Sequence, residues 1–204
     1  MNNKVLPAAF YMLLVGAAAA PDAALANEAL TAEDNRPIRF FVSAGYTHGG
    51  DDLLKLQFEK GGSEKITAGG GAMLGAGTIL PISQNNELQL SINYHGDSSS
   101  AKNGDAGFTR FPVEALIFTR NQHHRFGVGP TLHLNPEVEL DIDGQRKQSV
   151  TFDQALGAVA EYNFLVSEQV WLGLRYTYIQ YETKGVVTEE IDGNHVGLMV
   201  HLIF

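Results

Sequence analysis

The last ten residues of the chain, His195–Phe204, read HVGLMVHLIF, and this stretch decides how the rest of the sequence is interpreted. Apolar residues stand at every second position and end on an aromatic ring; they are Val196, Leu198, Val200, Leu202 and Phe204. Successive side chains of a β-strand point to opposite faces. The alternation therefore predicts a strand with one uniformly apolar face and one mixed face.

The same period of two continues upstream through most of the chain. It recurs in seven further segments, near residues 38–46, 66–80, 88–94, 111–117, 126–134, 156–164 and 170–178, so we expect eight strands. Short polar turns (83–86, 121–124 and 167–169) alternate with longer connections (48–63, 96–107, 139–148 and 182–194). Leu54, Leu56 and Phe58 keep the parity of the first strand, which predicts a protruding hairpin that closes at Lys60–Ser63.

Composition narrows the class of protein. The chain has 204 residues, which suits a single domain, and a formal net charge of −9, which disfavours a nucleic-acid partner. It contains no cysteine, so disulfides and thiolate metal sites are excluded. Its mean hydropathy of −0.08 is typical of soluble proteins. A barrel that spreads apolar residues over alternate positions nevertheless gives the same value.

The first 26 residues have the three parts of a secretory signal peptide. Lys4 is followed by an uncharged apolar run from Val5 to Ala20, and Ala24-Leu25-Ala26 is a small-x-small cleavage site. The alternative, a transmembrane anchor, is disfavoured by Pro7, Pro21 and the shortness of the run. We therefore expect a cleaved signal peptide over 1–26 and a mature domain over 27–204.

Three features favour a membrane barrel over an aqueous β-sandwich. The mixed face is rich in small residues, which suits a narrow barrel interior. The strands run about 10 residues, which spans the hydrocarbon core when they are tilted. Aromatic residues fall toward both ends of the apolar bands, as in the two girdles of an outer-membrane barrel; they are Tyr46, Tyr94, Tyr176 and Tyr178 at one end and Phe126, Phe164 and Phe204 at the other. We predict an all-β fold, an eight-stranded antiparallel up-and-down transmembrane β-barrel with both termini in the periplasm.

On these residues the mature chain resembles the small outer-membrane barrels of the OmpA and OmpX type. The resemblance implies insertion into the outer membrane of a Gram-negative bacterium, as a monomer in contact with outer-membrane lipid and lipopolysaccharide. It also implies that Val196, Leu198, Val200, Leu202 and Phe204 form the signal read by the barrel assembly machinery. No functional residue of the family is carried over.

Five charged residues have the parity of the barrel interior: Arg39, Glu114, Arg125, Glu161 and Arg175. An eight-stranded barrel is just wide enough for side chains to fill, and isolated charges there carry a large desolvation penalty. We therefore predict buried ion pairs that plug the lumen. The expected pairs are Glu114 with Arg175, and Glu161 with Arg125 or Arg39.

Other polar residues give weaker indications. His95, His133, His195 and His201 share the interior parity, and hydrogen-bonded lumen histidines are favoured over a metal site. His95, Asp97 and Ser98 lack the His-x-Ser spacing of lipid A deacylases. Glu137, Glu139, Asp141 and Asp143 are interpreted as a solvated acidic loop rather than a Ca²⁺ or Mg²⁺ site. We expect no catalytic, cofactor or metal residues.

These observations predict a non-enzymatic protein with a structural or surface-interaction role, presenting four extracellular loops on a rigid barrel. The first alternative is a narrow porin-like channel, or a conduit for small apolar molecules. A lipid A-modifying enzyme is the less favoured alternative.

Overall fold

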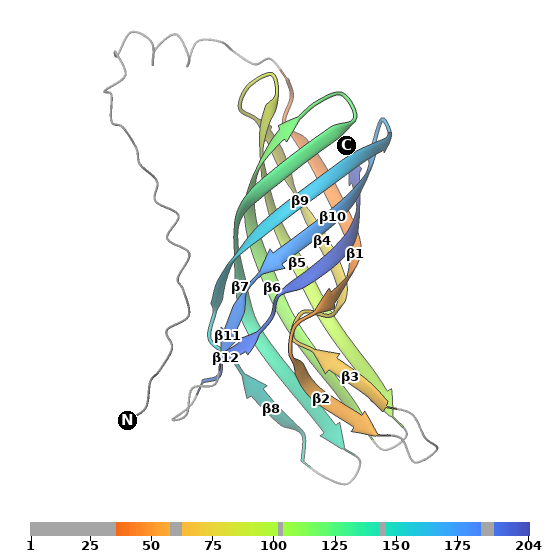
Figure 1. The fold of residues 1–204 in the computed structure, drawn as a ribbon, viewed down its shortest axis with the longest axis vertical. Coiled ribbons are helices and arrows are strands. Elements are labelled where there is room, and N and C mark those ends of the chain that lie inside the picture. The colour runs from red at the N-terminus through yellow and green to blue at the C-terminus, as the bar shows by residue number, and fades with distance from the viewer. Residues whose placement is uncertain (1–35, 58–62, 102–103, 143–145, 185–189) are drawn as a thin grey trace, which may run out of the picture. The chain divides into compact units, whose positions relative to one another are not determined.

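The computed structural model describes residues 36–204 except 58–62, 102–103, 143–145 and 185–189 (Figure 1). The predicted signal peptide lies outside this part of the chain. All elements in it are strands: β1 (Arg39–Gly49), β2 (Asp52–Gln57), β3 (Ser63–Thr67), β4 (Gly71–Pro81), β5 (Asn86–Ala101), β6 (Gly104–Arg120), β7 (His124–Ile142), β8 (Gln148–Thr151), β9 (Ala155–Ser167), β10 (Val170–Tyr178), β11 (Gln180–Glu182), β12 (Glu190–Asp192) and β13 (His195–Ile203). No helix long and apolar enough to span a membrane occurs among these residues.

Eight of the strands form a closed antiparallel barrel. Their order around the ring is β1, β4, β5, β6, β7, β9, β10 and β13. The ring closes between β1 and β13, which pair from Phe41 opposite Ile203 to Gly49 opposite His195. Closure leaves no unpaired strand edge in the ring, which is the condition for a sheet to stand in lipid. The predicted eight-stranded antiparallel barrel is confirmed.

The two faces of the barrel wall have opposite character. Along β13 every second residue from His195 to Ile203 is buried, and the residues between them are exposed. The exposed positions around the ring are mostly large apolar side chains, such as Leu174, Leu198 and Phe204. The buried positions include many polar or charged ones, such as Arg175 and Glu161. This inverted distribution is typical of a barrel with lipid outside and a polar interior.

The two ends of the barrel differ. One end carries the short connections near residues 82–85, 121–123 and 168–169, and it is called the short-turn end. At the other, the long-loop end, β5, β6 and β7 continue well beyond their neighbours, with 16, 17 and 19 residues against 9 in β10. The small elements β2, β3, β8, β11 and β12 also lie there (Figure 1).

The first long connection contains the predicted hairpin. Strand β2 pairs with β3, from Leu54 opposite Ile66 to Gln57 opposite Ser63. Of the predicted closing turn, residues 60–62 lie outside the described residues, and Ser63 is the first residue of β3. The single strand expected over 66–80 is instead divided into β3 and β4. The break falls at residues 68–70, directly before Gly71, which has a φ of 116° that side-chain-bearing residues rarely adopt.

An apolar cluster lies at the long-loop end, and we call it the apolar cap. Its buried members are Ile66, Ala68, Ala106, Phe108, Val138, Phe152, Ala155, Ile179 and Tyr181. The rings of Phe108, Phe152 and Tyr181 contact one another, with centroids 5.5–6.2 Å apart. Leu53, Leu54, Leu140 and Ile191 pack against it, so segments from several long connections share one small core.

Two prolines interrupt the hydrogen-bond ladder of the long strands. The β5–β6 register omits the position of Pro112, and the β6–β7 register omits that of Pro130. Proline has no N–H to donate, so each removes a ladder bond. The carbonyl of Pro112 accepts a hydrogen bond from the Asn93 side chain instead (3.3 Å).

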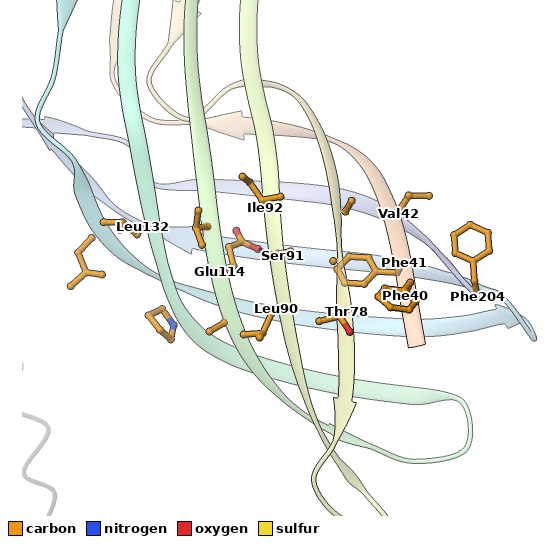
Figure 2. Close-up of a pocket in the computed structure, with 16 residues that line it drawn as sticks. Phe40, Phe41, Val42, Thr78, Leu90, Ser91, Ile92, Glu114, Leu132 and Phe204 are labelled. Carbon is orange, nitrogen blue, oxygen red and sulfur yellow. Dashed lines mark hydrogen bonds between the residues drawn. The ribbon is translucent and has the colours of Figure 1, made fainter. Parts of the chain in front are cut away.

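The outer wall is hollowed over the same region. A groove of about 950 Å³ crosses the outward face from β1 to β9, and Figure 2 shows the strands curving beside it. Small residues such as Ala76, Gly77 and Ala115 contribute to it, together with larger apolar residues such as Phe40, Leu90 and Ile92.

Candidate functional site

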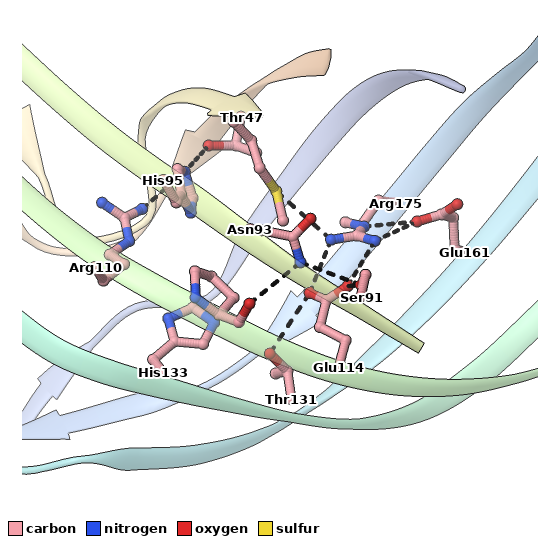
Figure 3. Close-up of polar contacts among 12 residues, drawn as sticks. Thr47, Ser91, Asn93, His95, Arg110, Glu114, Thr131, His133, Glu161 and Arg175 are labelled. Atoms are coloured by element: carbon pink, nitrogen blue, oxygen red, sulfur yellow. Dashed lines mark hydrogen bonds and ion pairs between the residues drawn. The ribbon is translucent and has the colours of Figure 1, made fainter. Parts of the chain in front are cut away.

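The middle of the lumen holds a network centred on Arg175. Its Nη1 and Nη2 donate to the two carboxylate oxygens of Glu114, across the lumen from β10 to β6, at 2.9 and 3.0 Å. Its Nε donates to Glu161 Oε2 at 2.7 Å. Figure 3 shows the guanidinium between these two carboxylates. Two-pronged arginine–carboxylate contacts of this kind are among the stronger hydrogen bonds in proteins.

Polar side chains complete the network. Ser91 and Thr131 donate to Glu114 at 3.4 and 3.5 Å, and Asn163 donates to Glu161 at 2.9 Å. His201 Nε2 lies 2.9 Å from Glu161 Oε1. All of these groups are buried, so the carboxylates exchange water for fixed partners.

The structure brings Glu114 and Arg175 together, but it does not bring Glu161 to Arg125 or Arg39. Glu161 and Arg175 are directly opposite each other in the β9–β10 register. Directly opposed residues on one face of an antiparallel pair lie within about 5.5 Å at Cβ, so the neighbouring strand supplies the partner. The expected Glu161 pairing was therefore wrong in its partner.

Arg39 and Arg125 belong to a second cluster, at the short-turn end, around Glu87. Arg39 Nη2 and Arg120 Nη1 donate to Glu87 Oε1 at 2.6 and 2.8 Å. Arg125 Nη1 lies 4.0 Å from Glu87 Oε2. Arg125 also stacks on Phe118 and Trp171, with its guanidinium carbon 4.3 and 5.1 Å from the ring centroids. We call Glu87, Arg39, Arg120 and Arg125 the mouth cluster.

A third polar cluster lies toward the long-loop end, around Arg110. Its Nη2 donates to the carbonyl of Gly70 (3.1 Å) and lies 2.9 Å from His95 Nε2. The His95 ring faces His195, with centroids 5.2 Å apart, and its Nε2 is 2.7 Å from the Thr47 hydroxyl. No carboxylate among the described residues forms an ion pair with Arg110, whose guanidinium instead lies 4.6 Å from the Phe108 ring centroid.

Tyr181 joins this third cluster to the apolar cap. Its ring packs in the cap, and its hydroxyl lies 2.7 Å from His133 Nδ1. Burial raises the pKa of Tyr181 to about 12, so the hydroxyl stays protonated at neutral pH. The polar lumen is thus followed directly by an apolar layer at the long-loop end.

The structure separates the other candidate groups. His95 is buried in the lumen, whereas Ser98 is exposed three residues further along β5, so they lie on opposite faces of the wall. Glu137, Glu139 and Asp141 lie on β7, where Glu139 forms an ion pair with Lys147 (2.9 Å), and Asp143 is outside the described residues. That contact raises the pKa of the exposed Lys147. No group of three potential metal ligands occurs in the part of the chain that the structure describes.

Glu87, Arg110 and Arg120 were missed because the expected strands were too short. The predicted segment 88–94 begins one residue after Glu87. The segment 111–117 begins one residue after Arg110 and ends three residues before Arg120. Strands β5 and β6 include all three positions. Extending the alternation outward would have placed all three on the interior face. The C-terminal residues Val196, Leu198, Val200, Leu202 and Phe204 are exposed on the outer wall, and their role as an assembly signal stays a prediction.

Known proteins share this architecture. The structure superposes on Ail, the attachment invasion locus protein of Yersinia pestis, with a TM-score of 0.52 and 10% identity, covering 82% of this chain and 97% of Ail. A second Ail structure, in complex with the heparin analogue sucrose octasulfate, gives a TM-score of 0.52 with 13% identity, covering 83% and 100%. The neisserial surface protein A (NspA) gives 0.49 with 15% identity, covering 82% and 97%. At these identities the likeness concerns the fold alone.

A search of curated protein sequences gives no match. A family model described as "Outer membrane protein beta-barrel domain" matches residues 10–204, a range that begins inside the predicted signal peptide. This match covers the whole of the closed eight-stranded ring. The chain therefore belongs to the outer membrane protein β-barrel domain family.

Proposed function

We propose that the protein is a closed outer-membrane barrel that presents a folded extracellular head for contact with a surface partner. The observation that carries the proposal is the apolar cap. A barrel whose loops only connect strands needs no shared core beyond the membrane, whereas here residues of β3, β6, β7, β9 and β11 pack together. Loops held in this way form a defined surface. Because they are already ordered, little conformational entropy is lost when a partner binds to them.

The proposed orientation places the short-turn end in the periplasm and the head outside the cell. The chain has no cysteine, so single cysteines can be introduced and labelled without background. Ser149→Cys on β8 should react with a membrane-impermeant maleimide on intact cells. Ser83→Cys at the short-turn end should react only after the outer membrane is permeabilised, and the reverse pattern would overturn the orientation.

The lumen is closed in this proposal. The Arg175 network crosses the barrel at mid-height, and the apolar cap lies beyond it. Planar-bilayer recordings of the purified protein should therefore show no stable unitary conductance. Large and reproducible current steps from the wild type would contradict the closed lumen and favour the porin-like alternative.

The charge of the head indicates the chemistry of a partner. Among the residues whose exposure the structure describes, exposed acids outnumber exposed bases near the long-loop end. The acids include Asp51, Asp52, Asp105, Glu139, Asp141, Asp153, Glu182, Glu190 and Asp192, and the bases within this described set are Lys65, Arg146, Lys147 and Lys184. Asp105 and Asp141 are directly opposite each other in the β6–β7 register, an arrangement that disfavours folding. A basic protein surface would complement this charge. The sulfated analogue in the Ail complex is an anion, so its charge has the same sign as this head and is opposite to that of a basic protein surface.

Binding of intact cells to surfaces of defined charge tests this preference. Cells that express the protein should adhere more strongly than control cells to a basic protein coat, and no more strongly to heparin. Asp105→Asn/Asp141→Asn should reduce the adhesion, whereas Glu168→Gln at the opposite end should leave it unchanged. Equal adhesion to both coats would refute a charge-selective head, and an altered lipid A mass after overexpression would favour the enzyme alternative.

The expected contacts with lipid, lipopolysaccharide and the assembly machinery are part of the proposal, as is a monomeric state. The exposed apolar band supports a lipid environment, and Phe204 is exposed at the short-turn end of that band. Deleting Phe204 should reduce the amount of folded protein in the outer-membrane fraction. Full recovery of heat-modifiable protein in that fraction would contradict the assembly-signal role, and Ile38→Ser serves as a control for loss of apolar surface alone.

A further inference from the structure

The mouth cluster has more positive charge than its internal acid can balance. Arg39, Arg120 and Arg125 all approach the single carboxylate of Glu87. Nε and Nη2 of Arg125 are buried without a hydrogen-bond partner among the described residues. A carboxylate has room for about four hydrogen bonds, but it supplies only one negative charge to these three guanidinium groups, and Arg36 Nη1 also lies 3.5 Å from Glu87 Oε1. Among the residues that the structure describes, Arg39, Arg120 and Arg125 therefore have fewer negative charges near them than they need for balance.

Three members of the mouth cluster, Arg39, Glu87 and Arg120, line an accessible pocket, and Arg125 lies outside its lining. A cavity of about 150 Å³ at the short-turn end is lined by Arg36, Pro37, Arg39, Pro81, Glu87 and Arg120. The side chains of Arg39 and Arg120 are each 28% exposed, so their guanidinium groups are reachable from outside the barrel. Arginine presents paired N–H donors that match the oxygens of a phosphate group.

The outer groove begins just beyond this pocket on the same strands. Thr78 lines the groove and Pro81 lines the pocket, three residues apart on β4; Leu90 and Glu87 have the same relation on β5. At a rise of about 3.3 Å per residue, the two sites are about 10 Å apart along the strands, with the pocket on the inner side of the rim and the groove on the outer face, because residues three apart on a strand point to opposite faces. The polar headgroup layer is roughly 5–8 Å thick on each side of the hydrocarbon core. One lipid spans both sites when its phosphate lies at the barrel rim, where the Arg39 and Arg120 side chains are exposed, and its acyl chain lies on the outer face.

We infer that this end of the barrel binds one anionic phospholipid of the periplasmic leaflet. Arg39 and Arg120 hold its phosphate at the barrel rim, and an acyl chain occupies the groove over Ala76 and Ala115. Lipid binding is favoured for two reasons. The phosphate supplies the missing negative charge, and the acyl chain fills a hollow that the proline-interrupted wall leaves. The inference rests on the proposed orientation for the choice of leaflet, but not for the binding itself.

Native mass spectrometry of the purified full-length protein in detergent tests this binding. Titration with phosphatidylglycerol should give one retained lipid per protein, and phosphatidylcholine with the same acyl chains should be retained at least about tenfold more weakly. Arg39→Gln/Arg120→Gln should abolish the preference for phosphatidylglycerol. Lys147→Gln/Lys184→Gln removes two charges at the other end and should leave it intact. Equal retention of the two lipids by the wild type would overturn the proposal.

Two further variants separate a lipid site from a site for a soluble anion. Ala115→Phe narrows the groove and should weaken phosphatidylglycerol retention, whereas Ala160→Leu on the outer face of β9, outside the groove, should not. If Ala115→Phe has no effect while inorganic phosphate displaces the lipid, the pocket is a site for free phosphate and the lipid proposal fails. Folding of every variant is checked by the heat-dependent shift in electrophoretic mobility.

Glu87→Gln gives a test of opposite sign. It removes the competing carboxylate, so phosphatidylglycerol retention should increase severalfold, although the free protein becomes less stable. A purely structural role for the mouth cluster predicts lower stability with no gain in retention, and that result would also contradict the proposal. Cysteine labelling in cells reports on orientation separately, so failure of one inference is distinguishable from failure of the other.

Discussion

Arg175 and Arg110 are both fully buried arginines of the same lumen, and their surroundings differ. Arg175 faces two carboxylates, each within 3.0 Å, in a network that spans the barrel. Arg110 contacts a carbonyl oxygen, an imidazole and an aromatic ring, and the charge of Asp97 acts on it from beyond ion-pair distance. A narrow barrel therefore accommodates a buried cation in two ways, by direct counter-charges or by dipoles and a π-face. The two arrangements differ in which groups are left buried without a partner when the arginine is replaced.

Removing the cation from the Arg175 network has the largest expected effect. Arg175→Met leaves Glu114 and Glu161 buried without their counter-charge, which should cost about 3–5 kcal/mol in the free energy of unfolding. Urea titration of the protein folded into lipid vesicles measures this cost. The control is Glu114→Gln/Glu161→Gln/Arg175→Met, which removes all three charges and should recover most of the loss. A loss below about 1 kcal/mol for the single variant would show that water reaches the network.

A charge on the outer wall tests the contrast between lumen and lipid. Leu174 is 57% exposed and lies in the middle of β10, one residue from Arg175 but on the opposite face. Leu174→Arg should destabilise the protein by about 2–4 kcal/mol if the residue is near the bilayer midplane. Leu174→Ala is the matched control, and an equal effect of both changes would argue against lipid contact at this height.

The link between the third cluster and the apolar cap gives a smaller effect. Tyr181→Phe removes the hydroxyl that lies 2.7 Å from His133 and keeps the ring in the cap. The expected cost is about 1 kcal/mol, the usual net value of one buried hydrogen bond. The same urea titration applies, with His133→Gln/Tyr181→Phe completing the comparison. A cost above about 3 kcal/mol would mean that the hydroxyl also supports Arg110.

Removing Arg110 should have the smallest effect on stability. Arg110→Met leaves no paired carboxylate behind and removes the cost of burying a charge, so the expected change is within about 1 kcal/mol of zero. If the variant is instead as unstable as Arg175→Met, Asp97 is acting as its counter-charge. Arg110→Met/Asp97→Asn would then be more stable than Arg110→Met alone.

The alternation of the sequence was sufficient to predict the barrel and most of its interior. Side chains on a strand have a strict period of two, so the assignment of Glu114, Glu161 and Arg175 to the interior required no three-dimensional information. To predict the partner of Glu161, the register between β9 and β10 must be known. Register depends on the length of the connecting turn, which a sequence pattern defines only to within a residue or two.

The long-loop end was the least predictable part. Phe108, Phe152 and Tyr181 stand at or beyond the edges of the predicted loops, where alternation is weak and the sequence is polar. Their contacts join segments more than 25 residues apart, through pairings that no local pattern encodes. The mouth cluster was only partly predictable, because Glu87 and Arg120 lie where strand and turn meet and either assignment fits the residue type.

The register between β6 and β7, which contain Pro112 and Pro130, has local weak points. Of the eight seams between neighbouring strands in the ring, seven have a continuous register or a single interruption, at one bulge or one proline. The β6–β7 seam has two interruptions, a register shift near Phe111 and a gap at Pro130. This seam is long, with 14 paired positions, but the two interruptions divide it into three shorter runs, and the pairing is locally weakest beside them. Amide hydrogens of β6 and β7 that lie beside these interruptions should therefore exchange before those in the uninterrupted runs of the same two strands.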